Sequence, residues 1–265
     1  MAITALHTAA TGMQALATKI DVIANNIANA DTVGFKAARA NFQDLLYQLR
    51  AQPGVQTSED SWAALPTEVG LGVAVSNTQV IFKQGSATPT GNPLDAMIQG
   101  DGFFQVELPG GAIGYTRAGN FVRNADGELV LGNSFGYRLK DSPTIPEDVP
   151  NDEIGISADG RIIVTSDGQS QDLGQLELAR FVNPCGLLQD GANIFLATPA
   201  SGDPIEGRPG EEGLGLLMGG HLEQSTTESV AELVELIKAQ RVFQMNSQTI
   251  QAADESLRTV ANLRR

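Results

Sequence analysis

The residues that most often carry enzyme chemistry are scarce in this sequence and lie far apart. Only two histidines are present, His7 and His221, and Cys185 is the single cysteine. A Ser/His/Asp triad needs a histidine between a hydroxyl and a carboxylate, and a structural zinc site needs four clustered ligands. Neither set has obvious parts here. We therefore expect no catalytic residue, no metal site and no intrachain disulfide, with His7 on a helix face and His221 in a linker.

Paired carboxylates are the other pattern that could support catalysis, because glycoside hydrolases use two of them as acid and base or nucleophile. Each acidic pair of this chain sits beside proline or glycine, which is typical of a solvated loop. The pairs are Glu147 with Asp148, Asp152 with Glu153, and Glu211 with Glu212. The Gly-x-Gly sequences at 70–72 and 213–215 lack the third glycine and following helix of a dinucleotide site, so we expect no cofactor. An enzyme of the periplasmic wall, such as a glycan hydrolase, is kept as an alternative.

Charge is concentrated in the middle of the chain. The net formal charge is −14, and residues 45–221 carry nine basic and 22 acidic side chains. Residues 1–44 carry three of each kind, and residues 222–265 carry five basic and six acidic. An acidic surface repels nucleic acid and anionic membranes, and no apolar run reaches the roughly 18 residues of a membrane span. We expect neither nucleic-acid binding nor membrane insertion, and association through the nearly neutral ends.

Proline and glycine separate two helical ends from a middle that cannot be helical. All twelve prolines lie between Pro53 and Pro209. Of the 29 glycines, only Gly12 and Gly34 lie within the first 44 residues, and none follows Gly220. Both residue types disfavour helix interiors, so the two ends are the expected sites of long helices.

The first 28 residues carry apolar side chains at steps of three or four, which predicts a helix with a narrow, coiled-coil type of stripe. These are Ile3, Leu6, Ala10, Met13, Leu16, Ile20, Ile23 and Ile27. The helix is predicted to end near Asn29, because Asn and Asp side chains compete for backbone hydrogen bonds there. Gly34 can then adopt the left-handed conformation that closes a helix.

A second helix is predicted over 226–263. Ser225 and Glu228 have the spacing of a capping box, and apolar residues follow at mostly helical intervals. Such a helix would be about 57 Å long, whereas a compact globule of this chain length has a radius of gyration of about 18 Å. The helix would overhang its own domain, and we expect neighbouring subunits to cover the apolar stripes.

Short β-type runs separated by Asp-Gly and Gly-Asn turn signals fill the middle. They are 71–76, 78–82, 103–107, 128–131, 161–165, 175–181 and 193–197. The predicted fold class is α+β, with N- and C-terminal helices paired as a coiled coil and a mainly antiparallel β middle domain inserted between them.

The end of the first helix resembles the N-terminal signature of bacterial flagellar rod and hook proteins. Residues 24–36 read Ala-Asn-Asn-Ile-Ala-Asn-Ala-Asp-Thr-Val-Gly-Phe-Lys. The signature residues are Asn25, Asn26, Asn29, Thr32, Gly34, Phe35 and Lys36. Further stretches, at 42–48, 69–73, 90–95, 99–104, 115–119 and 222–225, look like the distal-rod member in particular. Departures from the family pattern stand at Thr226, Phe243, Gln244 and Cys185.

The resemblance implies a self-assembling structural protein, not an enzyme: a subunit of the flagellar basal-body distal rod, a rigid hollow drive shaft that transmits torque from motor to hook. It implies a helical inner-tube domain of 1–44 and 222–265, a connecting region of 45–92 and 198–221, and an outer β domain of 93–197. The implied assembly residues are Leu16, Ile20, Ile23, Ile27, Leu233, Ile237, Gln240, Arg241, Ile250 and Leu257. A hook or proximal-rod protein of the same family is the alternative.

A segment specific to the rod is expected over 42–65, where it would lock neighbouring subunits and keep the polymer straight. Its leading residues are Phe42, Leu45, Leu46 and Tyr47. The implied partners are further copies in a helical tube, proximal-rod and hook-side proteins, outer ring proteins and the flagellar type III export apparatus. The first basic residue is Lys19, so no charged n-region of a cleaved signal peptide is expected. The implied location is the periplasm-spanning basal body.

Overall fold

The computed structural model describes residues 2–53, 56–58, 61–62, 65–146, 148–166 and 169–263. The chain divides into two compact units. Unit 1 contains residues 1–28, 38–79 and 228–265, and unit 2 contains residues 29–37 and 80–227. A helix at each end with mainly antiparallel strands between them confirms the predicted α+β class.

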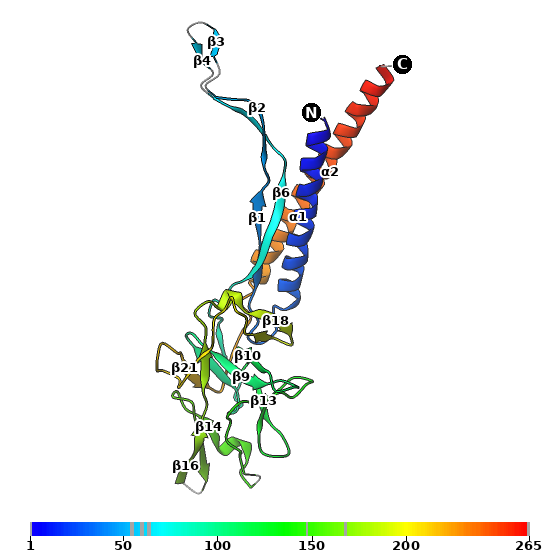
Figure 1. The fold of residues 1–265 in the computed structure, drawn as a ribbon. Coiled ribbons are helices and arrows are strands. Elements are labelled where there is room, and N and C mark those ends of the chain that lie inside the picture. Colours follow the sequence, from blue (N-terminus) through cyan, green and yellow to red (C-terminus); the bar gives the residue numbers. More distant parts are fainter. Residues whose placement is uncertain are drawn as a thin grey trace. The chain divides into compact units, whose positions relative to one another are not determined.

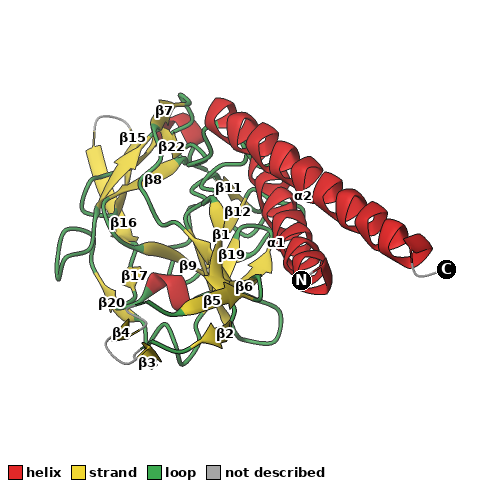
Figure 2. Ribbon diagram, turned by 90° about the horizontal axis from the view of Figure 1, so that it is seen from above, coloured by secondary structure: helices red, strands yellow, loops and turns green. Residues whose placement is uncertain are grey.

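Unit 1 is built on two helices, α1 (Ala2–Ala28) and α2 (Ser229–Leu263), which lie side by side (Figures 1 and 2). Gly12 lies beside Asn246, and Lys19 bonds to Glu235, so the helices run antiparallel. At the usual helical rise, α1 is about 40 Å and α2 about 53 Å long. The C-terminal turns of α2 therefore continue beyond the start of α1.

The helix ends agree with the prediction at α1 but not at α2. The helix α1 ends at Ala28, as expected from the Asn-rich sequence that follows. The helix α2 begins at Ser229, later than predicted, and the capping box does not form. Ser225 Oγ accepts a hydrogen bond from the Thr227 backbone N–H at 3.2 Å, outside the helix. Glu228 is the N-cap, because its carbonyl accepts the first helical bond from Glu232 at 3.0 Å.

The remaining part of unit 1 is a long β-ribbon. Its paired strands are β1 (Ala38–Asp44) with β6 (Val73–Val80), β2 (Tyr47–Ala51) with β5 (Thr67–Gly70), and β3 (Gln56–Ser58) with β4 (Ser61–Trp62). Leu45 donates to the Gly72 carbonyl at 2.9 Å and Leu71 donates to the Leu46 carbonyl at 3.1 Å, which links the first two pairs. The helix α1 packs against β1 (Figure 1).

The predicted runs 71–76 and 78–82 form one strand, β6, and no break separates them at Asn77. The Asn41 side-chain amide donates to Asn77 Oδ1 at 2.7 Å across the ribbon. Arg39 Nη2 donates to Gln79 Oε1 at 2.9 Å in the same way. These cross-strand pairs join polar side chains of the two strands, and Asn77 is exposed within β6, so its polar side chain requires no turn at this position.

Unit 2 is centred on β9 (Phe103–Glu107). This strand pairs with β10 (Ile113–Thr116) along one edge, and with β17 (Leu178–Arg180) and β13 (Arg138–Leu139) along the other. The nine-stranded sheet is completed by β11 (Phe121–Arg123), β12 (Leu129–Leu131), β18 (Leu188–Gly191), β19 (Ile194–Leu196) and β20 (Ile205–Gly207). The predicted run 175–181 is divided between the last residue of β16 (Gln169–Gln175) and β17.

Smaller sheets and two 3₁₀ turns complete unit 2. They are the three-stranded sheet of β14 (Ile154–Ile156), β15 (Arg161–Ser166) and β16 (Gln169–Gln175), and the pairs β7 (Ala87–Pro89) with β22 (His221–Glu223) and β8 (Ala96–Gln99) with β21 (Leu216–Gly219). The 3₁₀ turns are η1 (Asn151–Glu153) and η2 (Pro184–Gly186). Two hydrophobic clusters stabilise the unit, one around Phe104 and Phe121 and one around Phe103, Phe181 and Phe195.

Candidate functional site

Two motif regions from opposite ends of the sequence meet inside unit 2. Lys36, the last residue of the N-terminal signature, donates from Nζ to Glu223 Oε1 at 2.6 Å. Each residue is only 1% exposed. Lys36 Nζ also donates to the Lys83 carbonyl at 2.7 Å, and Glu223 Oε1 accepts from the Gly85 N–H at 2.7 Å. Burial lowers the pKa of Lys36, and the negative charge of Glu223 opposes this shift.

Gly34 is required by both its conformation and its neighbours. Its φ is +68°, and an added Cβ would lie 2.7 Å from the carbonyl carbon of Arg117 and 2.8 Å from the nitrogen of Ala118. The Gly34 N–H donates to the Glu223 carbonyl at 2.8 Å. A side chain at this position would clash with the backbone of Arg117 and Ala118 and disturb the hydrogen bond to Glu223, the acid that Lys36 binds.

Thr226 has a structural role beside this pair. Thr226 Oγ1 accepts a hydrogen bond from the Ala37 N–H at 2.9 Å, and its own N–H donates to the Phe35 carbonyl at 3.1 Å. The Thr226 hydroxyl therefore accepts a hydrogen bond from the Ala37 N–H, a backbone donor just after the signature that would otherwise lack this partner.

Asn26 joins three elements of unit 1. Its amide donates to the Ala38 carbonyl at 2.8 Å, and its Oδ1 accepts from the Ala38 N–H at 3.0 Å. The side chain thus pairs with the first residue of β1 as a neighbouring strand would. The same amide also donates to Glu232 Oε1 on α2 at 3.2 Å. Asn26 is 1% exposed, so the loss of these bonds would leave a buried amide without partners.

The remaining signature residues shape the turn that follows α1. Thr32 Oγ1 donates to Asn29 Oδ1 at 3.1 Å, and the Thr32 N–H donates to the Asn29 carbonyl at 3.2 Å. The Phe35 N–H then donates to the Thr32 carbonyl at 3.2 Å. Asn25 lies exposed on α1.

Small side chains are prominent where the helices of unit 1 are most buried. Ala9, Ala15 and Ile23 of α1 and Ala239 of α2 are each no more than 5% exposed. An added Cβ on Gly12 would lie 3.1 Å from Asn246 Nδ2, so the helices approach closely at this level. The apolar stripe predicted from the sequence contains one alanine, Ala10, which is exposed, and misses Ala9, Gly12 and Ala15.

The predicted assembly residues differ widely in burial. Ile23 is buried, and Leu16, Ile20, Ile27 and Ile250 are half-buried. Leu233 and Ile237 remain 47% and 50% exposed. Leu257, Gln240 and Arg241 are also exposed.

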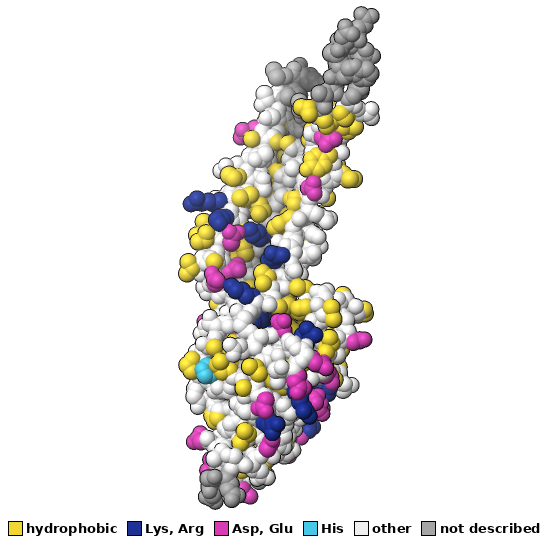
Figure 3. Space-filling model, turned by 90° about the vertical axis from the view of Figure 1, so that its left-hand side faces the viewer, with side chains coloured by type: hydrophobic (Ala, Val, Ile, Leu, Met, Phe, Trp, Pro, Cys, Tyr) yellow, Lys and Arg dark blue, Asp and Glu magenta, His cyan; other side chains and the backbone are white. Residues whose placement is uncertain are grey.

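One monomer leaves much apolar surface of α2 uncovered. Figure 3 shows hydrophobic side chains exposed over the helices of unit 1. On α2 the large ones are Val230, Leu233, Val234, Ile237, Val242, Phe243, Met245 and Leu257. Exposed apolar patches mark interaction sites, and Val230, Leu233, Val234 and Ile237 have the spacing of one helix face, so we take this face as the candidate contact surface.

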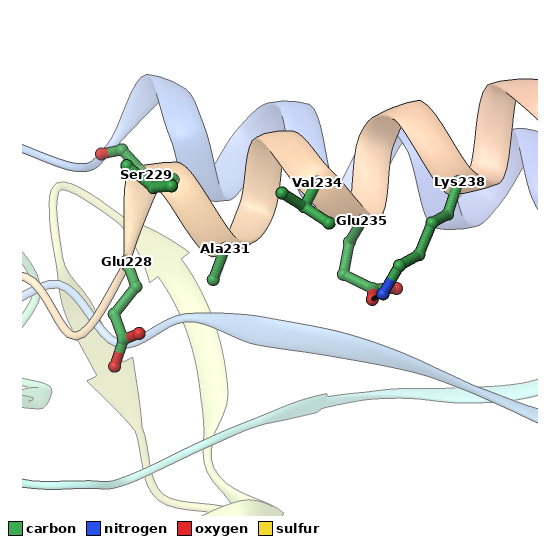
Figure 4. Close-up of a pocket in the computed structure, with 7 residues that line it drawn as sticks. Glu228, Ser229, Ala231, Val234, Glu235 and Lys238 are labelled. Atoms are coloured by element: carbon green, nitrogen blue, oxygen red, sulfur yellow. Dashed lines mark hydrogen bonds and ion pairs between the residues drawn. The ribbon is translucent and has the colours of Figure 1, made fainter.

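The first turns of α2 line an open hollow of about 540 Å³. Glu228, Ala231, Glu235 and Lys238 point to one side of the helix (Figure 4). Glu235 accepts hydrogen bonds from Lys238 Nζ at 2.8 Å and from Lys19 Nζ at 2.9 Å. These two bonds lower the pKa of Glu235 to about 2. A charged network thus lies next to the exposed apolar residues of α2.

The ribbon also presents large side chains to solvent. Phe42, Leu46 and Tyr47 are 41%, 83% and 56% exposed, and Leu45 is half-buried. A hydrogen bond to Asp44 and the negative charge of that residue raise the pKa of Tyr47. A two-stranded ribbon has little core of its own, so these residues are available for contacts with another chain.

The residues considered for enzyme chemistry are dispersed. His7 is exposed on α1, whereas His221 lies on β22, not in a linker, with Nδ1 2.9 Å from the Gly219 carbonyl. Cys185 lies in η2. Asp148, Asp152, Glu211 and Glu212 are exposed, Glu153 is half-buried, and Glu147 lies outside the described residues.

The described residues contain neither a candidate metal cluster nor a candidate membrane-spanning helix. No group of three or more His, Cys, Asp or Glu side chains in them could hold a metal ion. None of the helices in the same residues combines the length and apolar character needed to cross a bilayer.

Three family models match the chain. They describe a flagella basal body rod protein at residues 6–36, a flagellar hook protein FlgE/F/G D1 domain at 97–164, and a flagellar basal body rod FlgEFG protein C-terminal region at 218–263. The first match contains the Asn-rich signature, and the last contains Glu223 and α2.

Similar proteins align along nearly the whole chain. The flagellar basal-body rod protein FlgG of Caulobacter vibrioides is 45% identical over 98% of this chain and 99% of its own length. The protein of that name in Borreliella burgdorferi is 41% identical over 98% of both chains. The flagellar hook protein FlgE of Treponema pallidum is 37% identical over 54% of this chain and 33% of its own length.

Proposed function

Because the chain belongs to the FlgG family of flagellar basal-body rod proteins, we propose that it forms the distal part of the rod. The protein is a structural component of the basal-body rod. The observation that carries this conclusion is the alignment with rod relatives along 98% of the chain, against 54% for the hook protein. A hook role is therefore disfavoured. We propose no enzymatic activity.

The subunits polymerise through their helical ends. In this proposal, residues 1–44 and 222–265 form an inner tube, 93–197 form an outer β domain, and 45–92 with 198–221 connect them. The exposed apolar residues of α2, such as Val234 and Ile237, are covered by neighbouring copies. This arrangement supports a hollow, torque-transmitting shaft because apolar burial between copies is repeated along its whole length.

The segment 42–65 keeps the shaft straight. Its exposed side chains, Phe42, Leu46 and Tyr47, stand on a ribbon that a monomer leaves mostly uncovered. Contacts of these residues with adjacent subunits would oppose bending. This role distinguishes a rigid distal rod from a flexible hook.

The further partners follow from the place of the rod in the flagellum. Proximal-rod and hook-side proteins meet its two ends, and outer ring proteins surround it. Subunits leave the cell through the flagellar type III export apparatus without cleavage of a signal peptide and assemble across the periplasm.

Assembly through α2 is tested by placing charge on its apolar face. Val234→Asp and Ile237→Asp should each prevent tube formation, because a buried unpaired carboxylate is strongly unfavourable at an interface. Gln251→Asp, at an exposed polar position of α2, serves as the control. Sedimentation and electron microscopy measure the outcome. Normal tubes from both apolar-face variants would refute assembly through this face.

The straightening role is tested by an excision that leaves β1 and β6 paired. Replacing residues 46–71 with Asn-Gly joins Leu45 to Gly72, which are already hydrogen-bonded at 2.9 Å. Asn-Gly suits a two-residue hairpin turn. The shortened chain should form curved or flexible polymers in electron micrographs. Straight tubes would contradict the role proposed for the segment.

A further inference from the structure

Unit 2 contains a cavity that the proposed function does not use. Its volume is about 410 Å³, and its lining includes Arg117, Arg180 and Asp101 together with Phe82, Phe103 and Phe181. Two guanidinium groups and three phenyl rings thus meet in one concavity. The cavity lies within unit 2 and is separate from the exposed face of α2.

Each guanidinium keeps at least one buried N–H donor without a hydrogen-bond partner among the described residues. Arg117 is 6% exposed, and its Nε and Nη1 are buried without hydrogen-bond partners among the described residues. Arg180 Nε is also buried without a hydrogen-bond partner among these residues. The positive charge of Arg117 lies over the Phe103 ring at 5.3 Å from its centroid, a contact that provides no hydrogen-bond acceptor. Buried donors of this kind normally have partners.

The nearby carboxylates leave hydrogen-bond donors of both arginines unpaired, although Glu223 forms a long ion pair with Arg117. Glu223 Oε1 accepts a hydrogen bond from Lys36 Nζ at 2.6 Å. Glu223 Oε2 lies 3.7 Å from Arg117 Nη1, which is too far for a hydrogen bond. Asp101 is exposed and influences Arg117 through its charge alone. The charged residues that line the cavity are two arginines and one aspartate. One further negative charge would balance this lining.

We propose that this cavity binds a carboxylate group through Arg117 and Arg180. The planar guanidinium matches a carboxylate with two parallel N–H donors, and the phenyl rings accommodate the apolar stem of an acidic side chain. The source of the carboxylate in the rod is an Asp or Glu side chain of a neighbouring copy. Residues 45–221, which include most of unit 2, carry 22 acidic residues. Acidic side chains are visible on the surface of unit 2 in Figure 3.

The assignment of the source rests on the proposed function, whereas the affinity of the cavity for carboxylate does not. The probe is glutamate blocked at both its amino and α-carboxyl groups, and blocked glutamine is the neutral counterpart. Titration of the ¹⁵N-labelled full chain, followed by NMR, should shift signals of the cavity residues with the glutamate probe only. Absence of any shift would mean a water-filled cavity and would overturn the proposal.

Three variants make the test specific. Arg180→Met removes a charge but keeps much of the side-chain volume, and should weaken probe binding by about tenfold or more. Arg208→Met, at an exposed arginine of unit 2 outside the cavity, should leave binding unchanged. Asp101→Asn should strengthen binding, because it removes a competing negative charge. Equal binding by the wild-type chain and Arg180→Met would overturn the site.

The polymer distinguishes the two sources of carboxylate. If a neighbouring copy fills the cavity, the probe should bind the monomer but not the assembled wild-type tube, and Arg180→Met should raise the concentration needed for assembly. Equal binding of the probe to monomer and tube would overturn the neighbouring copy as the source and leave a free carboxylate as the ligand. A chain that forms no tube would refute the proposed function, while the monomer titration would still decide the site.

Discussion

Gly34 is the signature residue whose identity the structure explains most directly. Gly34→Ala should destabilise unit 2 by about 2 to 4 kcal/mol, because a positive φ strains any L-residue and backbone atoms at the new Cβ must also move. Those atoms belong to Arg117 and Ala118 and would lie 2.7–2.8 Å from the Cβ. Urea denaturation measures the loss of unfolding free energy.

Gly91 provides the matched control for this substitution. Its φ is +74°, but no atom of the described residues lies within 4 Å of an added Cβ. Gly91→Ala should therefore cost only the conformational strain, about 1 kcal/mol. Equal losses for the two variants would show that the close approach to Arg117 contributes nothing.

The ion pair of Lys36 with Glu223 should be among the most sensitive positions of the molecule. Lys36→Met leaves the Glu223 carboxylate buried, and we expect a loss of about 3 kcal/mol or more in unfolding free energy. Lys140→Met breaks a more exposed pair with Glu206, at 2.9 Å, and should cost about 1 kcal/mol or less. Thermal or urea unfolding compares the two variants. A similar small loss in both would argue against a structural role of the buried pair.

At the scale of elements, local sequence patterns predicted the structural features that depend on residues close together in the sequence. The absence of proline and the spacing of apolar residues identified α1, and the Asn-rich turn identified its end. The start of α2 was wrong, because Ser225 caps a turn in place of the helix. The break expected at Asn77 was also wrong, because its partner, Asn41, lies on another strand. Such partners are set by the tertiary fold and leave no local signal.

The antiparallel helix pair carries a charge network whose response to acid can be predicted. The pKa of Glu235 is lowered from 4.5 to about 2 by Lys238 and Lys19. A depressed folded-state pKa stabilises the protein above the unfolded value, so this contribution is complete above about pH 4.5 and is lost as pH falls toward 2. Glu235 is exposed to solvent, so the effect on stability is small although its titration is measurable.

Carboxyl ¹³C NMR of the labelled chain should give a midpoint for Glu235 near 2. Replacing both Lys19 and Lys238 with Gln should return the midpoint toward 4.5. A midpoint near 4.5 in the wild-type chain would show that the two lysines do not bind the Glu235 carboxylate when the protein is in solution.

At the scale of the whole molecule, the sequence predicted the classes of structure but not the meeting of distant motifs. Lys36 and Glu223 are separated by 187 positions, and each belonged to a recognisable motif without any indication that the two bind each other. Arg117 joins them from a third region. Spacing along the chain cannot reveal a contact that depends on how strands from three segments assemble.

The two units should differ in how much their order depends on assembly. All but one residue of β9 are buried within unit 2, whereas α2 exposes large apolar side chains and extends beyond α1. An amphipathic helix gains most of its stability from packing, so α2 should be only partly protected in the monomer and strongly protected in the tube. Amide hydrogen exchange of both states, with β9 as the internal reference, tests this. Equal protection of Ser229–Leu263 in monomer and tube would reject the coupling of helix order to assembly. A change in the protection of β9 as large as that in α2 would show that assembly orders the whole chain and not its helical ends alone.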